Sequence, residues 1–168
     1  NTQPFGASQS DADEAKALAV RQAVADVVDR ASIAKEVYND TYSPLYSMVP
    51  DGLTGAAKPF EKLYGNGKGG PDVDKAKETL SKAGVSGKVQ IDLQYSPDHY
   101  GSTSDDEYAA IKTQLENSGL FTVNLQSTVW TTYSQERVKD AYPVYQLGWF
   151  PDFSDADNYL SPFFSKDN

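Results

Sequence analysis

Two segments in the second half of the chain alternate between apolar and polar residues, and this pattern constrains the fold more than any other feature of the sequence. The segments are Val89–Tyr95 and Phe121–Gln126. Alternation with a period of two is typical of a β-strand with one buried face. Between them, Tyr108, Ile111 and Leu115 recur at helical spacing. The chain is therefore predicted to contain a strand–helix–strand unit.

One further helix and strand extend this unit, so that residues 89–149 read strand, helix, strand, helix, strand. The additional helix is predicted near Tyr133–Lys139 and the additional strand at Val144–Trp149. Helices between consecutive strands imply parallel pairing, and we therefore predict an α/β fold with a mostly parallel sheet flanked by helices. Ligands of such sheets bind beyond the carboxyl ends of the strands. The candidate binding segments are Ser96–Ser102, Ser127–Trp130 and Phe150–Asp157.

The first half of the chain is predicted to be helical at both ends and irregular between them. Helical spacing predicts helices at Ala12–Asp29, near Ile33–Tyr38 and at Asp72–Gly84. Residues 39–70 contain three Pro and six Gly without a regular period, so we expect this stretch to be functional or packed against another part of the protein. The expected organisation is a linker or tail at residues 1–11, followed by a single α/β lobe at residues 12–168.

Charge and residue composition exclude several classes of function. The chain has 15 Lys and Arg against 24 Asp and Glu, a net charge of −9, which argues against nucleic acid or an anionic membrane as its main partner. The absence of Cys excludes disulfides and Cys-based metal sites. The sequence has no phosphate-binding, nucleophile-elbow, zinc-protease or dinucleotide motif. We predict no cofactor, no metal ion and no catalytic residue.

Residues 142–164 combine aromatic and acidic side chains. Eight of the chain's 20 aromatic residues lie there, together with Asp152, Asp155 and Asp157. This composition is typical of a ligand pocket wall, and a packed C-terminal segment explains it equally well. We expect the tail from Phe150 to Asn168 to be irregular, with Phe163 and Phe164 packed inside the protein.

The three aspartates leave several chemistries open. Their spacing does not match the twelve-residue calcium loop. Two carboxylates could hydrolyse a glycoside, and a single carboxylate among aromatic rings could receive a ligand's ammonium group through a charge-assisted hydrogen bond. A solvated turn with an Asp that caps the next helix is the simplest interpretation for Asp155 and Asp157.

His99 and Arg137 each have two interpretations. His99 is the only histidine, and without a nearby Ser or Cys nucleophile it indicates a neutral loop residue or a ligand contact. Arg137 lies on the helix after the second strand, where it could hold a carboxylate or pair with a surface acid.

Five segments of the chain form a characteristic series. They are AVRQAVADVVDRASIAKEVYN (19–39), DVDKAKETLSKAG (72–84), VQIDLQYSPDHYG (89–101), STVWTTYSQER (127–137) and YQLGWFPDFSDADNYL (145–160). In this order they resemble the second lobe of the extracellular oligopeptide- and dipeptide-binding proteins, the solute receptors of ABC importers. The most specific part is GWFPDFSDADNYL. The resemblance implies a lobe with the fold of the periplasmic binding proteins.

This resemblance implies roles for residues of the last two segments. In peptide-binding members, the Asp three residues after the motif Trp pairs with the peptide's α-ammonium group, and this role falls on Asp152. Trp149 and Phe150 would line the same pocket. Trp130 would form part of a side-chain pocket, and Arg137 would be a basic residue of the cleft.

Three further positions differ from the family pattern. Ser96 falls where some members carry an Asn that contacts the peptide. His99 lies near a His used in some members, although the loop length differs here. Gln146 stands where some members carry an Arg that meets the peptide's C-terminus, so the resemblance leaves peptide length open.

The function implied is a non-enzymatic receptor that captures oligopeptides in a cleft between two lobes and delivers them to the membrane subunits of an ABC importer. The chain would be most of the second lobe, and the first lobe would be a separate part of the same protein. The protein would be extracytoplasmic, as a cell-surface lipoprotein or a periplasmic protein, and monomeric.

Other classes of function remain open at this point. Within the family, the solute could be nickel or an oligosaccharide, although an Asp at position 152 favours a ligand with an ammonium group. Outside it, a carboxylate-pair hydrolase would need Asp152 and a second acid to face each other across a cleft. A surface adhesion module would bind its partner without Asp152, Trp149 or Trp130.

Overall fold

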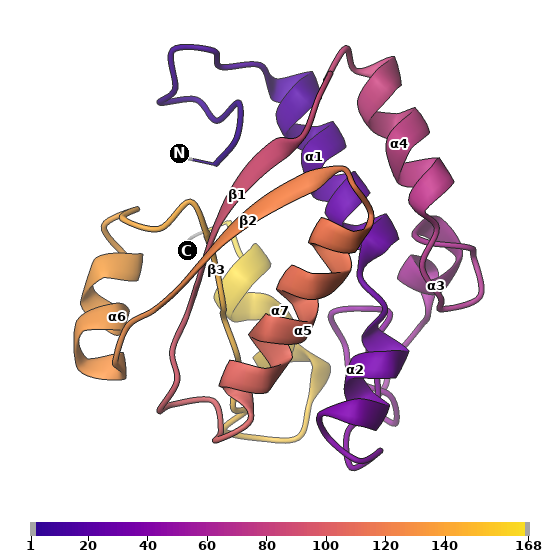
Figure 1. Ribbon diagram of the computed structural model, residues 1–168. Helices are drawn as coiled ribbons and strands as arrows, with labels where there is room; N and C mark the ends of the chain where they lie inside the picture. The colour runs from indigo at the N-terminus through magenta and orange to yellow at the C-terminus, as the bar shows by residue number, and fades with distance from the viewer. Residues whose placement is uncertain (1–2, 167–168) are drawn as a thin grey trace.

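A three-stranded parallel sheet forms the centre of the computed structural model, which describes residues 3–166 (Figure 1). β1 (Val89–Tyr95) lies between β2 (Phe121–Ser127) and β3 (Val144–Tyr145). It pairs with both neighbours in parallel, and with β2 along its whole length. The parallel α/β fold predicted from the alternating segments is confirmed.

Three long helices complete the core. α1 (Glu14–Val27) and α4 (Val73–Lys82) pack against each other, and α5 (Ser104–Asn117) packs against β2. Asp13 and Asp72 begin α1 and α4, because each carboxylate accepts a hydrogen bond from a backbone N–H of the first turn. The buried apolar residues that form one core cluster between these elements are Ala19, Val20, Ala23, Val27, Ala76, Leu80, Val89, Ile91, Leu93, Leu115, Phe121 and Val123.

Two shorter helices begin earlier than the periodicity indicated. α2 (Arg30–Glu36) begins three residues before the predicted Ile33, because the side chain of Asp29 caps it. α6 (Trp130–Arg137) begins three residues before the predicted Tyr133. The first backbone N–H of α6 donates to Asp98, a residue distant in the sequence. The residues next to Trp130 therefore give no local indication that the helix begins there.

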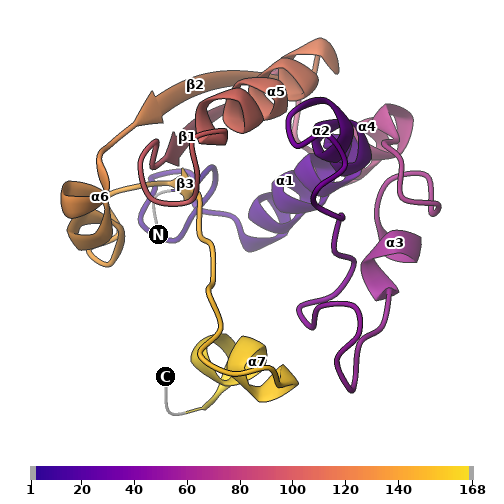
Figure 2. The same ribbon diagram turned by 90° about the horizontal axis from the view of Figure 1, so that it is seen from below.

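The third strand is much shorter than predicted. Instead of Val144–Trp149 it comprises only two residues, after which the chain leaves the sheet. The backbone N–H of Gln146 still donates to the Gln94 carbonyl (2.9 Å). The Gln146 carbonyl, however, accepts the hydroxyl of Tyr133 at 2.6 Å rather than an N–H of a neighbouring strand. From there an extended segment, residues 146–155, leads away from the sheet (Figure 2). We call residues 146–155 the linker; it is distinct from the linker predicted at residues 1–11.

The predicted irregular tail instead contains a helix, α7 (Ala156–Phe164). Asp155 caps it by accepting a hydrogen bond from the N–H of Asp157, as expected for one of these aspartates. The prediction that Phe163 and Phe164 are packed inside is wrong, because their side chains are 41% and 62% exposed. Figure 2 shows α7 held away from the sheet at the end of its linker, and every residue of the helix except Asn158 is exposed or half-buried.

The ends of the chain are described only in part. Residues 1–2 of the predicted linker and residues 167–168 of the predicted lobe lie outside the described residues. Within the predicted linker, Phe5 packs against the core, and its carbonyl accepts the N–H of Asp13. The division into a linker at residues 1–11 and a lobe at 12–168 stays a prediction.

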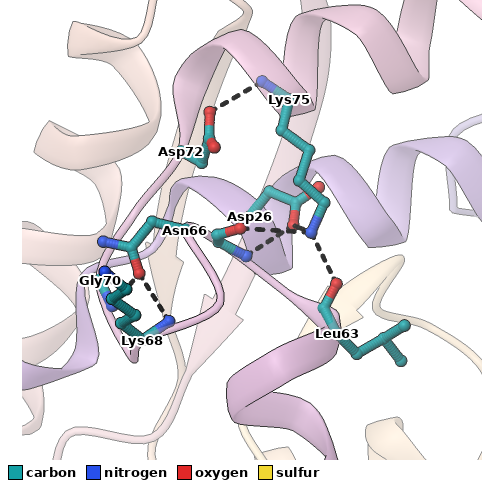
Figure 3. Close-up of polar contacts among 8 residues, drawn as sticks. Asp26, Leu63, Asn66, Lys68, Gly70, Asp72 and Lys75 are labelled. Atoms are coloured by element: carbon teal, nitrogen blue, oxygen red, sulfur yellow. Dashed lines mark hydrogen bonds and ion pairs between the residues drawn. The ribbon is translucent and has the colours of Figure 1, made fainter.

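A buried carboxylate anchors the irregular stretch, whose only helix is the short α3 (Pro59–Leu63) (Figure 3). Asp26 of α1 is 1% exposed, and its Oδ1 accepts the N–H of Gly65 at 2.7 Å. The same oxygen lies 3.0 Å from Nζ of Lys75, which also donates to the carbonyl of Leu63. Residues 63–65 are therefore held against α1 and α4 through one ion pair.

The loop that follows is closed by Asn66, whose Oδ1 accepts the N–H groups of Lys68 and Gly70 (Figure 3). Gly65 has a φ of +58°, and a Cβ at this position would lie 2.0 Å from the carbonyl oxygen of Gly70. Only glycine fits this turn. The expectation that the irregular stretch is packed against another part of the protein is confirmed for this loop.

The half-buried Tyr38 and the buried Tyr133 are expected to make the fold sensitive to alkali. Burial, together with a hydrogen bond to Glu107, raises the pKa of Tyr38 to about 12, and burial raises the pKa of Tyr133. In the unfolded chain, a tyrosine titrates at pH ~10. Because the folded pKa is raised, this contribution to stability is present below about pH 10 and is lost as the pH rises through about 12.

We therefore expect the free energy of unfolding, measured with urea at a series of pH values, to be flat up to about pH 9 and to fall above about pH 10. Tyr38→Phe removes one titrating group and is expected to reduce the slope of this fall. A free energy of unfolding that stays constant up to pH ~11.5 would contradict the raised pKa values of Tyr38 and Tyr133.

Candidate functional site

Residues from all three predicted binding segments meet at the carboxyl edge of the sheet. The imidazole of His99 stacks on the indole of Trp130, with 3.5 Å between ring centroids and 4° between planes. Tyr100 meets Trp130 edge to face at 5.6 Å, and Phe150 lies 6.0 Å from His99 and 6.3 Å from Tyr100. We call His99, Tyr100, Trp130 and Phe150 the aromatic cluster. Phe150 is 67% exposed, so the cluster presents apolar surface to solvent.

Asp98 holds the backbone of Trp130 at the start of α6 and was not identified from the sequence. Its Oδ1 accepts the backbone N–H of Trp130 at 2.9 Å and the hydroxyl of Ser96 at 3.0 Å. The bond from Trp130 holds the pKa of Asp98 below its usual value. Asp98 thereby supplies the cap that α6 lacks locally, since Val129 has no capping side chain. The available signal was an Asp directly after Ser-Pro, which is typical of a turn residue that bonds to backbone.

Ser96 and Gln146 lie inside the protein, bonded to each other. Ser96 is 0% exposed and Gln146 is 7% exposed. Oε1 of Gln146 accepts the backbone N–H of Ser96 at 3.0 Å. The two residues tie the end of β1 to the start of the linker, 50 residues later in the chain. Ser96 and Gln146 therefore support the candidate site from inside the protein. A direct contact of either residue with a ligand stays a prediction.

The ring of Tyr100 packs against the backbone of Gly148 in the linker. A Cβ at position 148 would lie 2.6 Å from both Cδ1 and Cε1 of the Tyr100 ring. This close approach needs glycine for its lack of a side chain. The contact fixes the loop after β1 to the linker that carries Trp149 and Phe150.

Gly148→Ala is expected to lower the free energy of unfolding by about 1–3 kcal/mol, because an added methyl group must displace the Tyr100 ring. Urea unfolding measures this loss. In a Tyr100→Ala background the same substitution is expected to cost much less, since the displaced ring is absent. An equal cost in both backgrounds would show that the Tyr100 contact is not its cause.

Two candidate residues of the linker, Trp149 and Asp152, are exposed and share a hydrogen-bond partner, the buried side-chain amide of Asn158. Trp149 is 41% exposed and Asp152 is also exposed. Nε1 of Trp149 donates to Oδ1 of Asn158 at 3.0 Å, and the backbone N–H of Asp152 donates to the same oxygen at 3.2 Å. Asn158 was not identified from the sequence, because it stands among polar residues with no spacing that sets it apart.

Arg137 is the last residue of α6, the helix that begins with Trp130 of the aromatic cluster. Its guanidinium lies 5.9 Å from the ring centroid of Tyr145. Its Nε is buried and has no hydrogen-bond partner among residues 3–166. An unsatisfied guanidinium N–H is costly, so this atom offers a donor to an acceptor that the described residues do not supply.

An open pocket of about 870 Å³ adjoins the aromatic cluster. It lies between α2, the start of α5 and the linker, and its walls include Tyr38, Tyr100, Glu107, Trp149 and Phe150. Aromatic walls with a few polar groups are typical of a small-molecule site. Within residues 3–166, no group of three or more acidic or histidine side chains is arranged to hold a metal ion.

Comparison with known proteins gives a consistent family. Residues 10–168 match the family described as bacterial extracellular solute-binding proteins, family 5 Middle. The oligopeptide-binding protein OppA of Bacillus subtilis (strain 168) is 28% identical over 159 residues, which cover 88% of this chain and 27% of the relative. The chain spans about a quarter of the length of the curated relatives it matches.

The solved structures that share the fold include the following two. A dipeptide-binding protein of Pseudoalteromonas sp. SM9913, in complex with Met-Leu, matches with a TM-score of 0.76 and 23% identity over 92% of this chain and 29% of its own. The binding protein MoaA of A. tumefaciens R10, in complex with mannopinic acid, matches with a TM-score of 0.73 and 26% identity over 93% of this chain and 29% of its own.

The similar proteins are solute-binding proteins and not enzymes, in agreement with the receptor implied by the sequence. None of the helices formed by residues 3–166 has the length and apolar character needed to cross a membrane. Because the family match covers nearly the whole chain, the chain belongs to the bacterial extracellular solute-binding proteins, family 5, and represents their middle region.

Proposed function

We propose that the chain is most of the second lobe of a peptide receptor, in which Asp152 receives the α-ammonium group of the peptide. The observation that carries the proposal is the position of Asp152. Asp152 is exposed and lies on the same turn as Trp149, two residues after Phe150 of the aromatic cluster. A carboxylate beside aromatic surface offers an ammonium group a charge-assisted hydrogen bond.

The surrounding residues support specific roles within this proposal. Trp149 and Phe150 would cover the start of the peptide, and the stacked pair of Trp130 and His99 would form an apolar wall for a side chain. Arg137, with its unpartnered Nε, would act as a basic residue toward a ligand group or the rest of the protein. Ser96 and Gln146 would hold the two site loops together from inside.

The partners are part of the same proposal. The other half of the cleft would come from a first lobe in the same, longer protein, and the peptide would be passed to the membrane subunits of an ABC importer. The protein would act outside the cytoplasm as a monomer, as a periplasmic protein or a cell-surface lipoprotein. The family name, which describes extracellular solute-binding proteins, supports this location.

The experiment compares free and N-acetylated peptides of three to five residues, by calorimetry on the full-length protein. Acetylation removes the ammonium charge and leaves the rest of the peptide in place. Tight binding that acetylation abolishes is the expected result. Equal binding of free and acetylated peptides would remove Asp152 from this role, and binding of no peptide would exclude the peptide receptor.

A different solute is the second candidate, because the similar MoaA structure holds mannopinic acid rather than a peptide. Nickel and oligosaccharides are further solutes implied by the sequence resemblance. The same calorimeter separates these candidates, since a non-peptide receptor would bind its solute and leave every peptide in solution.

A further inference from the structure

We propose that Asn158 is a positioning residue of the binding site, which holds Trp149 and Asp152 in a fixed relation through one side-chain oxygen. The inference rests on the proposed function, in which Trp149 and Asp152 contact the ligand. Asn158 itself is buried and acts through these two residues.

A single oxygen of Asn158 accepts hydrogen bonds from two exposed residues, Trp149 and Asp152. Oδ1 of Asn158 lies 3.0 Å from Nε1 of Trp149 and 3.2 Å from the backbone nitrogen of Asp152. Asn158 is 6% exposed, whereas Trp149 is 41% exposed. A carbonyl oxygen has two lone pairs, so both bonds can form at once. The oxygen thereby joins the side chain of one ligand-facing residue to the backbone of the other.

α7 supplies a firm base for this oxygen. Asp155 caps the helix, and the N–H of Asn158 donates to the Asp155 carbonyl at 3.2 Å, so that Asn158 sits in the first turn. A second contact reinforces the first, because the ring of Trp149 meets Phe163 edge to face at 5.2 Å. The turn at residues 149–152 is therefore attached to α7 at both of its ends.

This attachment matters because the other contacts of the linker are made by Gln146, Gly148 and Phe150, whereas the Asn158 oxygen is the acceptor for both Trp149 and Asp152. The linker leads away from the sheet as an extended segment, as Figure 2 shows. Without the Asn158 oxygen, the indole N–H and the Asp152 N–H would lose their common partner, and the Trp149 ring could turn independently of the Asp152 backbone. A site that must be ordered on binding has a lower affinity than one that is already in place.

The test begins without ligand, on the full-length protein labelled with ¹⁵N-tryptophan. Trp149→Phe identifies the indole N–H resonance of Trp149 by its disappearance. Asn158→Leu, which keeps a side chain of similar size but removes the acceptor, is expected to move this resonance upfield and to speed the exchange of the indole proton with water. Asn158→Asp keeps an acceptor oxygen at the same place and is expected to preserve the hydrogen-bonded position.

An unchanged Trp149 indole resonance in Asn158→Leu would overturn the proposal. If Asn158→Leu does not fold, as judged by circular dichroism, the Asn158→Asp protein decides alone, since loss of the hydrogen-bonded indole resonance in that folded variant would also overturn it.

Affinity for a tripeptide is the second measurement. Asn158→Leu is expected to weaken binding about tenfold, and less than that in a Trp149→Phe background, where one of the two bonds is already absent. Full wild-type affinity in Asn158→Leu would overturn the positioning role. If the wild-type protein binds no peptide, the proposed function fails, and the indole resonance still decides whether Asn158 holds the turn.

Discussion

Asp152→Ala is expected to weaken peptide binding by roughly 30-fold to several thousandfold in the full-length protein, the largest effect on affinity of any change at the site. Removing one partner of a buried, hydrogen-bonded charge pair costs about 2–5 kcal/mol, much of it because the other charge stays buried and unpaired. In the proposed complex, the unpaired charge is the peptide's α-ammonium group. Calorimetry with a single tripeptide measures the loss.

Two controls make this result specific. Asp157→Asn changes a neighbouring carboxylate that bonds to Ser161 within α7, and it is expected to leave the affinity within about twofold of wild type. N-acetylated peptide, which lacks the ammonium group, is expected to bind the wild-type and Asp152→Ala proteins equally weakly. Near-wild-type affinity of Asp152→Ala for the free peptide would show that the ammonium group is bound elsewhere.

Asp26→Ala is expected to cause the largest loss of stability, about 2–4 kcal/mol in the free energy of unfolding. The substitution removes the acceptor for the buried N–H of Gly65 and the partner of Lys75. Breaking a fully buried pair costs about 3–5 kcal/mol, and the value is smaller here because the Lys75 side chain is 37% exposed and can regain water.

Urea unfolding measures this loss, and Glu78→Ala is the matched control. Glu78 pairs with Lys82 on the surface of α4, at 2.6 Å but with both side chains more than half exposed. Its removal is expected to cost no more than about 0.5 kcal/mol. Equal losses for the two substitutions would mean that the Asp26 network contributes no more than a surface ion pair.

Elements marked by local patterns were predicted well. The alternation of Val89–Tyr95 and Phe121–Gln126 located both long strands, and Asp72 located the start of α4. A strand or helix shows a regular period because one of its faces is buried. The apolar residues of that face recur at fixed spacing along the chain, so the local sequence reveals them. The prediction failed where a start depended on a distant partner, as at Trp130, whose N–H is bound by Asp98 from 32 residues away.

The site shows the same division. The exposed aromatic and acidic residues Trp149, Phe150 and Asp152 stood out because such side chains are unusual beside one another. The residues that arrange the site did not stand out, because Asn158, Asp98 and Tyr100 are ordinary loop or helix residues when considered alone. Their importance lies in contacts across 6 to 48 positions of the chain, from Asp152 to Asn158 and from Tyr100 to Gly148.

The parallel α/β order, the two long strands and the family can be predicted from the amino-acid sequence, because each depends on short periodic patterns or on a motif of adjacent residues. The end of β3 after Tyr145, the burial of Ser96 and Gln146, and the contact of Asn158 with the site turn become visible only in the folded molecule. A buried hydrogen bond forms wherever packing brings donor and acceptor together, and packing between distant segments leaves no pattern in either segment alone.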